Sequence, residues 1–187
     1  MKAKVWLFDC FKPWVGAVAL ACVSASLCEA AETTPDRHAQ MTAAYVFNFV
    51  KFVEWPPGAV AEELVVCFVG APEVRAALAA SVGSKQATMS TARIKNLIAR
   101  DVSAGSSLEE CQVLFLSGDK AGIPKHRAAL TIGESDDFTL RGGIIRLYTE
   151  SNRLRFIINV DNAKREGIQV SSNLLKLATH VEQGGAR

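Results

Sequence analysis

The chain has 187 residues, of which 49% are hydrophobic and 21% are charged, and this is the composition of an ordinary globular protein. A chain of this length suits one domain with its own hydrophobic core. The formal net charge of +2 and the lack of any block of basic residues argue against nucleic acid as a partner, so we expect no nucleic-acid binding.

Residues 1–30 are predicted to be a cleaved secretory signal peptide. Three lysines precede the apolar run 15–27, and Cys28 and Ala30 can serve as the small residues of a cleavage site. A transmembrane anchor is one alternative, but the run is short for a span of about 20 residues and no charged stop follows it. A lipoprotein cleavage site at Cys22 is another alternative, although the leucine of such a site is one position displaced here.

Removal of this segment leaves residues 31–187, a single predicted domain in which Cys67 and Cys111 are the remaining cysteines. Two cysteines in an exported protein most simply form one disulfide, and two separate buried thiols are the alternative. A metal site needs more ligands than these, and the three histidines show no ligand spacing, so we expect no metal.

The first predicted element is a helix over residues 38–54, because apolar residues recur at helical spacing from Met41 to Phe52. Core packing explains its many aromatic residues, and the alternative is a face that docks a partner or a second copy. A buried strand over 64–70 and a helix that begins at Pro72 follow. The single glycine after this strand is no nucleotide-binding fingerprint.

The middle of the chain gives shorter elements. A strand is favoured over residues 91–98, and the adjacent serines 106–107 are predicted to cap a short helical turn. Asp136 and Asp137 are predicted to cap a brief helix; as neighbours in sequence they point in different directions, which argues against a catalytic pair. The other predicted elements are a strand over 112–118, a helix over 124–129 and a strand over 130–132.

A β-hairpin is predicted near the end of the chain, with strands over 144–149 and 153–160 joined by a turn at 150–152. Residues of the second strand alternate between a core face (Leu154, Phe156, Ile158, Val160) and an outer face (Arg153, Arg155, Ile157, Asn159).

Two helices are predicted after the hairpin. Asp161 is expected to cap a short helix that Gly167 ends. Ser171 and Ser172 are expected to cap a last helix over 173–181, which has these inward residues: Leu174, Leu175, Leu177 and Ala178. Together the elements predict one α/β domain, with its core at about 38–182. Its mixed sheet has about five to six strands with helices on both faces, and the C-terminal antiparallel hairpin is followed by helices.

Four segments carry a resemblance to a known family: "AAYVFNFVKFVEWPP" (43–57), "LVVCFVG" (64–70), "CQVLFLS" (111–117) and "GGIIRLYTESNRLRFIINVDNAKREGIQVSSNLLKLA" (142–178). The chain resembles the YfiR family of exported α/β proteins over about residues 41–181. The first and last segments are the specific ones, since the two strands between them would fit many α/β folds.

The resemblance implies a periplasmic homodimer without catalytic activity. It implies binding to the periplasmic sensing domain of a membrane-bound diguanylate cyclase, which represses that enzyme and lowers cyclic-di-GMP and biofilm formation. It also implies that a disulfide corresponding to Cys67–Cys111 supports the fold. A second disulfide described in this family has no cysteines here, so redox switching that depends on it is not expected.

We therefore expect a non-catalytic binding protein with no cofactor. The candidate surface for a partner or ligand consists of Arg146, Arg153, Arg155, Ile157 and Asn159, although its arginines could equally form a solvated hairpin face. The alternative function is a periplasmic small-molecule sensor, or an accessory protein for another membrane signalling protein such as a histidine kinase. No catalytic residue is assigned, because the sequence has neither a G-x-S-x-G nor an H-E-x-x-H motif.

Overall fold

A computed structural model describes residues 36–60, 62–85, 96–103, 107–118, 122–123 and 128–183, all of which belong to one compact unit. The predicted signal peptide lies outside these residues. So do most of the helix predicted over 124–129, the residues 91–95 of a predicted strand and the serine at position 106. Within the described residues, no helix is both long enough and apolar enough to cross a bilayer.

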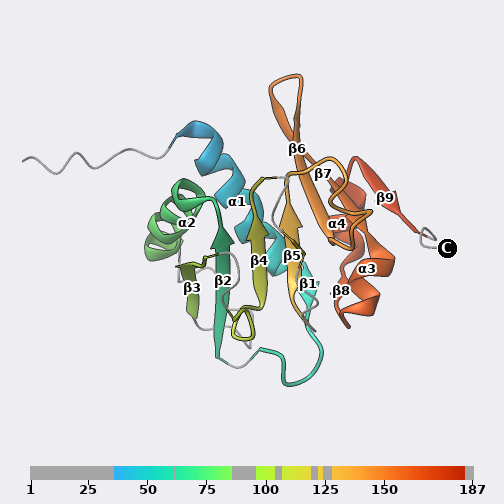
Figure 1. The fold of residues 1–187 in the computed structure, drawn as a ribbon, viewed down its shortest axis with the longest axis horizontal. Coiled ribbons are helices and arrows are strands. Elements are labelled where there is room, and N and C mark those ends of the chain that lie inside the picture. The colour runs from blue at the N-terminus through green and yellow to red at the C-terminus, as the bar shows by residue number, and fades with distance from the viewer. Residues whose placement is uncertain are drawn as a thin grey trace, which may run out of the picture. The chain divides into compact units, whose positions relative to one another are not determined.

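Seven strands form the main sheet in the order β3-β2-β4-β5-β6-β7-β9 (Figure 1). Their bounds are β2 (Glu63–Val69), β3 (Asn96–Asp101), β4 (Val113–Leu116), β5 (Leu130–Gly133), β6 (Ile145–Glu150), β7 (Arg153–Asn159) and β9 (His180–Glu182). The pairs from β3 to β6 are parallel, β6 and β7 are antiparallel, and β7 and β9 are parallel. The predicted α/β class with a mixed sheet is thereby confirmed, with seven strands rather than five or six.

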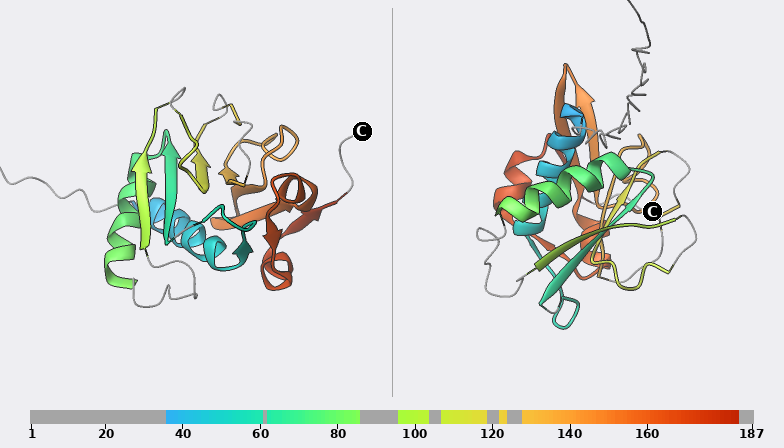
Figure 2. Two further views of the ribbon diagram at one scale, coloured as in Figure 1. Left: turned by 90° about the horizontal axis from the view of Figure 1, so that it is seen from below. Right: turned by 90° about the vertical axis from the view of Figure 1, so that its left-hand side faces the viewer.

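Two long helices, α1 (Arg37–Lys51) and α2 (Pro72–Lys85), lie side by side on one face of this sheet (Figure 2). Alternate residues of β2 and β4 point into the core that these helices cover, and Phe68 and Phe115 meet there with ring centroids 5.6 Å apart. The uninterrupted apolar runs of β2 and β4 are explained by burial on both faces.

The other face of β2 and β4 carries the predicted disulfide between Cys67 and Cys111, whose Cα atoms are 5.8 Å apart. Both cysteines are buried in a small apolar cluster with Leu114 and Ala129. Among the described residues, loop positions such as Val102 pack against this cluster.

The β6–β7 hairpin confirms the predicted turn between residues 150 and 153. Ser151 and Asn152 both have positive φ, 50° and 60°, as a two-residue type I′ hairpin turn requires. The core face of β7 packs on α1: the ring of Phe156 lies 5.0 Å from Phe49 and 6.0 Å from Tyr45. The aromatic residues of α1 on this side are therefore core residues.

The C-terminal elements differ from the prediction. They are α3 (Val160–Arg165), β8 (Gln169–Val170), α4 (Ser172–Leu177) and β9. The predicted helix over 173–181 is wrong beyond Leu177, where α4 ends. The side chain of Leu177 was predicted to point inward, but it is 67% exposed. Ala178 is extended, and the N–H of Thr179 donates to the carbonyl of Phe156 instead of continuing the helix. Pairing with β7 thus takes the place of the last helical turn.

The first predicted helix also ends early, at Lys51, and is followed by the short strand β1 (Val53–Glu54). β1 pairs with β8 in a separate two-stranded antiparallel sheet, in which Val53 lies opposite Val170. The brief helix predicted at Asp136 and Asp137 is also absent, since residues 136–142 form turns.

Candidate functional site

The outer face of β6, β7 and β9 is the surface on which the predicted site residues lie. The strand register sets Arg146 opposite Ile157, Tyr148 opposite Arg155, and Ile157 beside His180. Because side chains alternate along a strand, this face carries the even positions of β6 and the odd positions of β7. We call it the outer face, and it comprises Arg146, Tyr148, Glu150, Arg153, Arg155, Ile157, Asn159, His180 and Glu182.

Charged groups of the outer face are arranged in pairs around an aromatic ring. The guanidinium of Arg146 forms an ion pair with Asp136 and lies 5.0 Å from the ring centroid of Tyr148. Arg155 forms an ion pair with Glu150 at 2.8 Å. The ion pairs are partly exposed, so they hold side chains in place without adding much stability. The result is a mixed-charge surface with an apolar centre at Tyr148 and Ile157, and both residues are partly buried.

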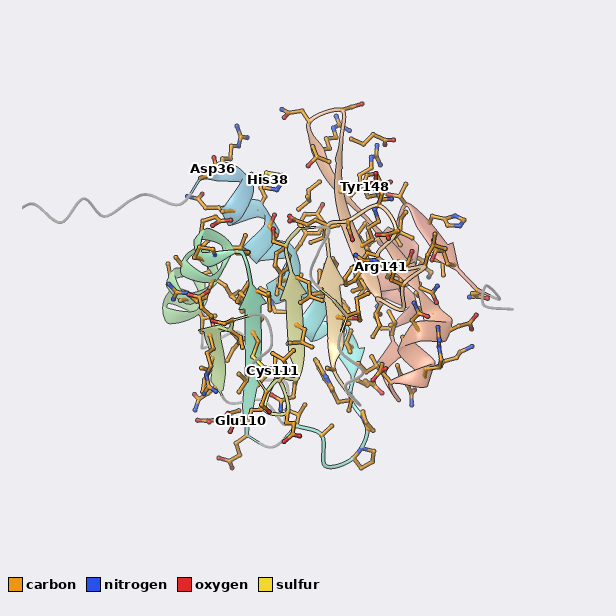
Figure 3. The ribbon with its side chains drawn as sticks, in the orientation of Figure 1. Asp36, His38, Glu110, Cys111, Arg141 and Tyr148 are labelled. Carbon is orange, nitrogen blue, oxygen red and sulfur yellow. A yellow bond between two sulfur atoms is a disulfide. The ribbon has the colours of Figure 1, made fainter. Side chains whose placement is uncertain are left out.

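The hairpin that carries this face extends past its neighbours. β5 pairs with β6 only at residues 145 and 146, and β9 pairs with β7 only at residues 157–159. The tip therefore projects beyond the carboxyl end of β5, and Tyr148 lies near it, far from Cys111 at the amino end of β4 (Figure 3). A projecting two-stranded arm is accessible to a macromolecular partner.

Asn159 belongs to the outer face by register, yet it is only 6% exposed. Its side-chain oxygen accepts from the backbone N–H of Asn162 at 2.9 Å, and its amide nitrogen donates to Glu182 at 3.1 Å. The carboxylate of Glu182 also accepts from the hydroxyl of Thr139 at 3.3 Å. Asn159 thus links α3 with β9 and, through Glu182, with the 136–142 turns. It differs from the other four predicted surface residues, which are exposed or half-buried.

Asn159, and not Asp161, is the N-cap of α3, so the predicted cap is corrected by two positions. The helix starts at Val160 because the Asn159 backbone is extended and its side chain reaches the N–H of Asn162. Asp161 lies in the first turn, 3.9 Å from Lys164. Ser171 caps α4 by accepting from the N–H of Leu174 at 3.3 Å, and Ser172 is the first helical residue.

Asn159→Ala is expected to lower the free energy of unfolding by about 1–2 kcal/mol, because it removes the cap and leaves a buried network incomplete. Asp161→Ala is the matched control, two positions away, and should cost at most about 0.5 kcal/mol through its weak interaction with the helix dipole. Urea denaturation of both variants measures the difference. Equal losses would contradict the assignment of Asn159 as the cap.

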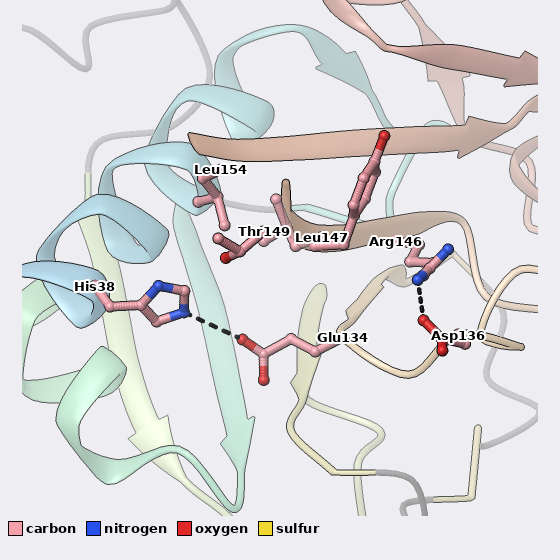
Figure 4. A pocket seen from close by; sticks show the side chains of 8 residues that line it. His38, Glu134, Asp136, Arg146, Leu147, Thr149 and Leu154 are labelled. Atoms are coloured by element: carbon pink, nitrogen blue, oxygen red, sulfur yellow. Dashed lines mark hydrogen bonds and ion pairs between the residues drawn. The ribbon is translucent and has the colours of Figure 1, made fainter. Parts of the chain in front are cut away.

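Two hollows border the outer face. One, of about 310 Å³, lies beside β6 and is lined by residues that include His38, Glu134, Asp136 and Thr149 (Figure 4). The other, of about 420 Å³, lies beside β9 and is lined by residues that include Leu140 and His180. Within the described residues, no group of three or more His, Cys, Asp or Glu side chains is placed to hold a metal ion.

Several residues were not predicted from the sequence to lie at this site, namely Tyr148, Glu150, Asp136, Glu182 and Thr139, although Asp136 was considered as a helix cap. The alternation of Arg146, Tyr148 and Glu150 along the first hairpin strand was a usable signal for Tyr148 and Glu150. The remaining residues come from other segments, and nothing local in the sequence indicates that they meet β6 or β7.

Comparison with known proteins gives one extensive match. The model of a family described as YfiR/HmsC-like matches residues 39–179, which is most of the chain. Comparison with curated proteins gave no match.

Solved structures give weaker similarities. A conserved domain protein from Vibrio cholerae O1 biovar eltor is 13% identical with a TM-score of 0.46. An ABC domain in complex with L-Trp from Streptococcus pneumonia is 11% identical with a TM-score of 0.41. Each comparison covers 77% of this chain, which spans only 60% of the length of either solved chain. At these values neither similarity supports a statement about function.

Proposed function

The chain belongs to the YfiR/HmsC-like family, and on that ground we propose that it is an exported, non-catalytic binding protein that represses a membrane signalling enzyme. The proposed partner is the periplasmic sensing domain of an inner-membrane diguanylate cyclase. Repression of that enzyme lowers cyclic-di-GMP and biofilm formation. The protein acts as a homodimer and without a cofactor. The family match over residues 39–179 is the observation that carries this proposal.

Export is part of the proposal. Residues 1–30 act as a signal peptide that is removed, and the domain 31–187 works in the periplasm without inserting into the membrane. The disulfide between Cys67 and Cys111 supports this, since such bonds persist in oxidising compartments and are rare in the cytosol.

Repression requires that the protein binds the inactive state of its partner more tightly than the active state. A preference of about 100-fold corresponds to about 2.7 kcal/mol of coupling free energy. We place the contact on the outer face, because arginine and tyrosine are the residue types that most often dominate protein interfaces. Its partly exposed ion pairs can be exchanged for pairs with a partner at little cost.

Arg155→Glu is expected to raise the dissociation constant for the sensing domain by about tenfold or more, which is about 1.4 kcal/mol. The reason is that a partner charge facing Arg155 would meet a carboxylate instead of a guanidinium. The measurement is calorimetric titration of residues 31–187 with the periplasmic sensing domain of a membrane-bound diguanylate cyclase from the same organism.

Arg75→Glu provides the matched control. Arg75 is a similarly exposed arginine on α2 that pairs with one carboxylate, Asp101, at 2.6 Å, and it lies at the opposite edge of the sheet from β9. This variant should bind like the wild type. No complex at micromolar concentration with the wild-type protein would count against the proposed function, and equal weakening by both variants would count against the outer face.

A further inference from the structure

The loop that joins the parallel neighbours β5 and β6 is tied to the rest of the domain at several points. It spans residues 134–144 and contains no helix. The buried ring of Phe138 anchors it in the core. The side-chain amide of Asn162 on α3 donates to the carbonyls of Thr139 at 2.8 Å and of Gly143 at 2.6 Å. The path of this loop is therefore set by contacts with both the sheet and α3.

The same loop presents an exposed leucine. Leu140 is 79% exposed, although its neighbour Thr139 is only 4% exposed. The guanidinium of the next residue, Arg141 (labelled in Figure 3), forms an ion pair with Asp137 at 3.0 Å and donates to the hydroxyl of Ser135 at 2.6 Å. Because the backbone on both sides is held in this way, a partner that binds Leu140 has little ordering of the loop to offset.

Leu140 borders the hollow of about 420 Å³ beside β9. A single exposed leucine is ordinary on a protein surface, so its exposure alone indicates no site. Here, however, Val181 adds a second apolar residue to the lining, and Asn159 and Glu182 add polar groups. Asn159 and Glu182 belong to the outer face, so the hollow is continuous with the surface on which we place the contact with the sensing domain.

The carboxylate of Glu182 gives this hollow a negative charge that no cation balances within the part of the chain that the structure describes. Its oxygens accept from the neutral side chains of Asn159 at 3.1 Å and of Thr139 at 3.3 Å. By contrast, Asp136 and Glu150 nearby each pair with an arginine. A carboxylate can accept at about four positions, so two neutral donors leave room for a bidentate cation.

We propose that the hollow beside β9 receives an arginine side chain of the sensing domain. The aliphatic stem of this arginine lies against Leu140 and Val181, and its guanidinium binds the carboxylate of Glu182. Charge complementarity with Glu182 calls for a cationic group. The exposed Leu140 favours a protein over a free small cation, because a cation bound in the hollow would leave the leucine uncovered. This inference rests on the proposed function and specifies which group of the partner is bound.

Leu140→Ala is expected to raise the dissociation constant for the sensing domain about tenfold, because the bound arginine loses the apolar surface under its stem. The variant should unfold at the wild-type temperature, since the side chain is 79% exposed. Met41→Ala is the matched control: it also removes an exposed apolar side chain, but from α1, which packs on the opposite face of the hairpin. Calorimetric titration with the periplasmic sensing domain of a membrane-bound diguanylate cyclase from the same organism measures all three proteins.

Glu182→Gln tests the charge separately. Glutamine keeps an oxygen that can accept from Asn159, and its amide can donate to the hydroxyl of Thr139, so the network around the α3 cap stays satisfied. The dissociation constant should rise about tenfold and depend less on sodium chloride concentration, because one ion pair with the partner is lost. Glu110→Gln removes a carboxylate that pairs with Arg100 at 2.8 Å far from β9, and it should change neither quantity.

Wild-type affinity in both Leu140→Ala and Glu182→Gln would overturn this inference and leave the proposed function in place, because the complex itself would still form. Sedimentation of Leu140→Ala across a concentration series tests a second copy of the chain as the competing occupant. A weaker homodimer together with unchanged binding to the sensing domain would assign the hollow to that second copy and overturn the inference. No complex with the wild-type protein would instead remove the proposed function, and this inference with it.

Discussion

Cys67→Ser is expected to lower the free energy of unfolding by about 4 kcal/mol. The disulfide joins residues 44 positions apart, and a cross-link over such a loop restricts the unfolded chain strongly. The substitution also leaves the thiol of Cys111 and a serine hydroxyl in an apolar cluster with Leu114 and Ala129. A buried hydroxyl without a partner adds to the loss. Urea denaturation of residues 31–187 measures the effect.

The double variant Cys67→Ala and Cys111→Ala separates the two causes, because it removes the cross-link but buries no new polar group. It should keep most of the loss, and the wild type in reductant should match it closely. Alkylation of the native protein without reductant should find no free thiol among Cys67 and Cys111. Two free thiols, or a loss under about 1 kcal/mol in the double variant, would contradict this account.

Gly133→Ala is expected to cost about 3 kcal/mol, at the upper end of the range for overpacking a core. A Cβ atom at Gly133 would lie 2.3 Å from the ring of Phe138, and a Cβ at Gly143 would lie 2.2 Å from the opposite edge of that ring. The ring is 1% exposed and held between two glycine backbones, so it cannot move away from the new methyl group. Glycine is needed here for space rather than for an unusual φ.

A double-mutant cycle with Phe138→Ala tests this cause. In that background the ring is gone, so Gly133→Ala should cost less than about 1 kcal/mol. Gly122→Ala is the matched control, since a Cβ there meets nothing within 4 Å, and it should change stability by no more than about 0.5 kcal/mol. An equal cost of Gly133→Ala in both backgrounds would show that the overlap with Phe138 is not its cause.

The α/β fold could be predicted from patterns that are local in the sequence. The apolar run of β2 indicates a strand buried on both faces, and the alternation from Leu154 to Ile158 indicates a hairpin strand with one core face. The two predicted hairpin strands, 144–149 and 153–160, leave the turn between them at Ser151 and Asn152. Such signals depend on residues close together in the chain, and contacts with distant segments do not change the elements they predict here.

The missed features depend on contacts between distant segments. The predicted helix continues through His180 and Val181, but the N–H of Thr179 donates to the carbonyl of Phe156, and β9 pairs with β7 there instead. Asn159 could not be recognised as the N-cap because the sequence allows either Asn159 or Asp161 to cap the helix. Its contact with Glu182 and the buried Asn162 settles the choice.

Less of the candidate site than of the fold could be predicted. Arg146, Arg155 and Ile157 share the outer face because side chains alternate between the two faces of a sheet along each strand. Asp136, which pairs with Arg146, comes from the turns after β5, and its contribution requires the sheet order to be known.

The small β1–β8 sheet constrains how the protein can fold. It fixes the chain just after the first helix against a segment that follows the hairpin and α3, and the N–H of Ser171 donates to the carbonyl of Phe52 at 2.9 Å beside it. Contacts between such distant parts of a chain require closure of a large loop before they stabilise anything, and this slows folding. An N-terminal fragment that stops before Gln169 would therefore lack the partner of β1, the strand that directly follows α1.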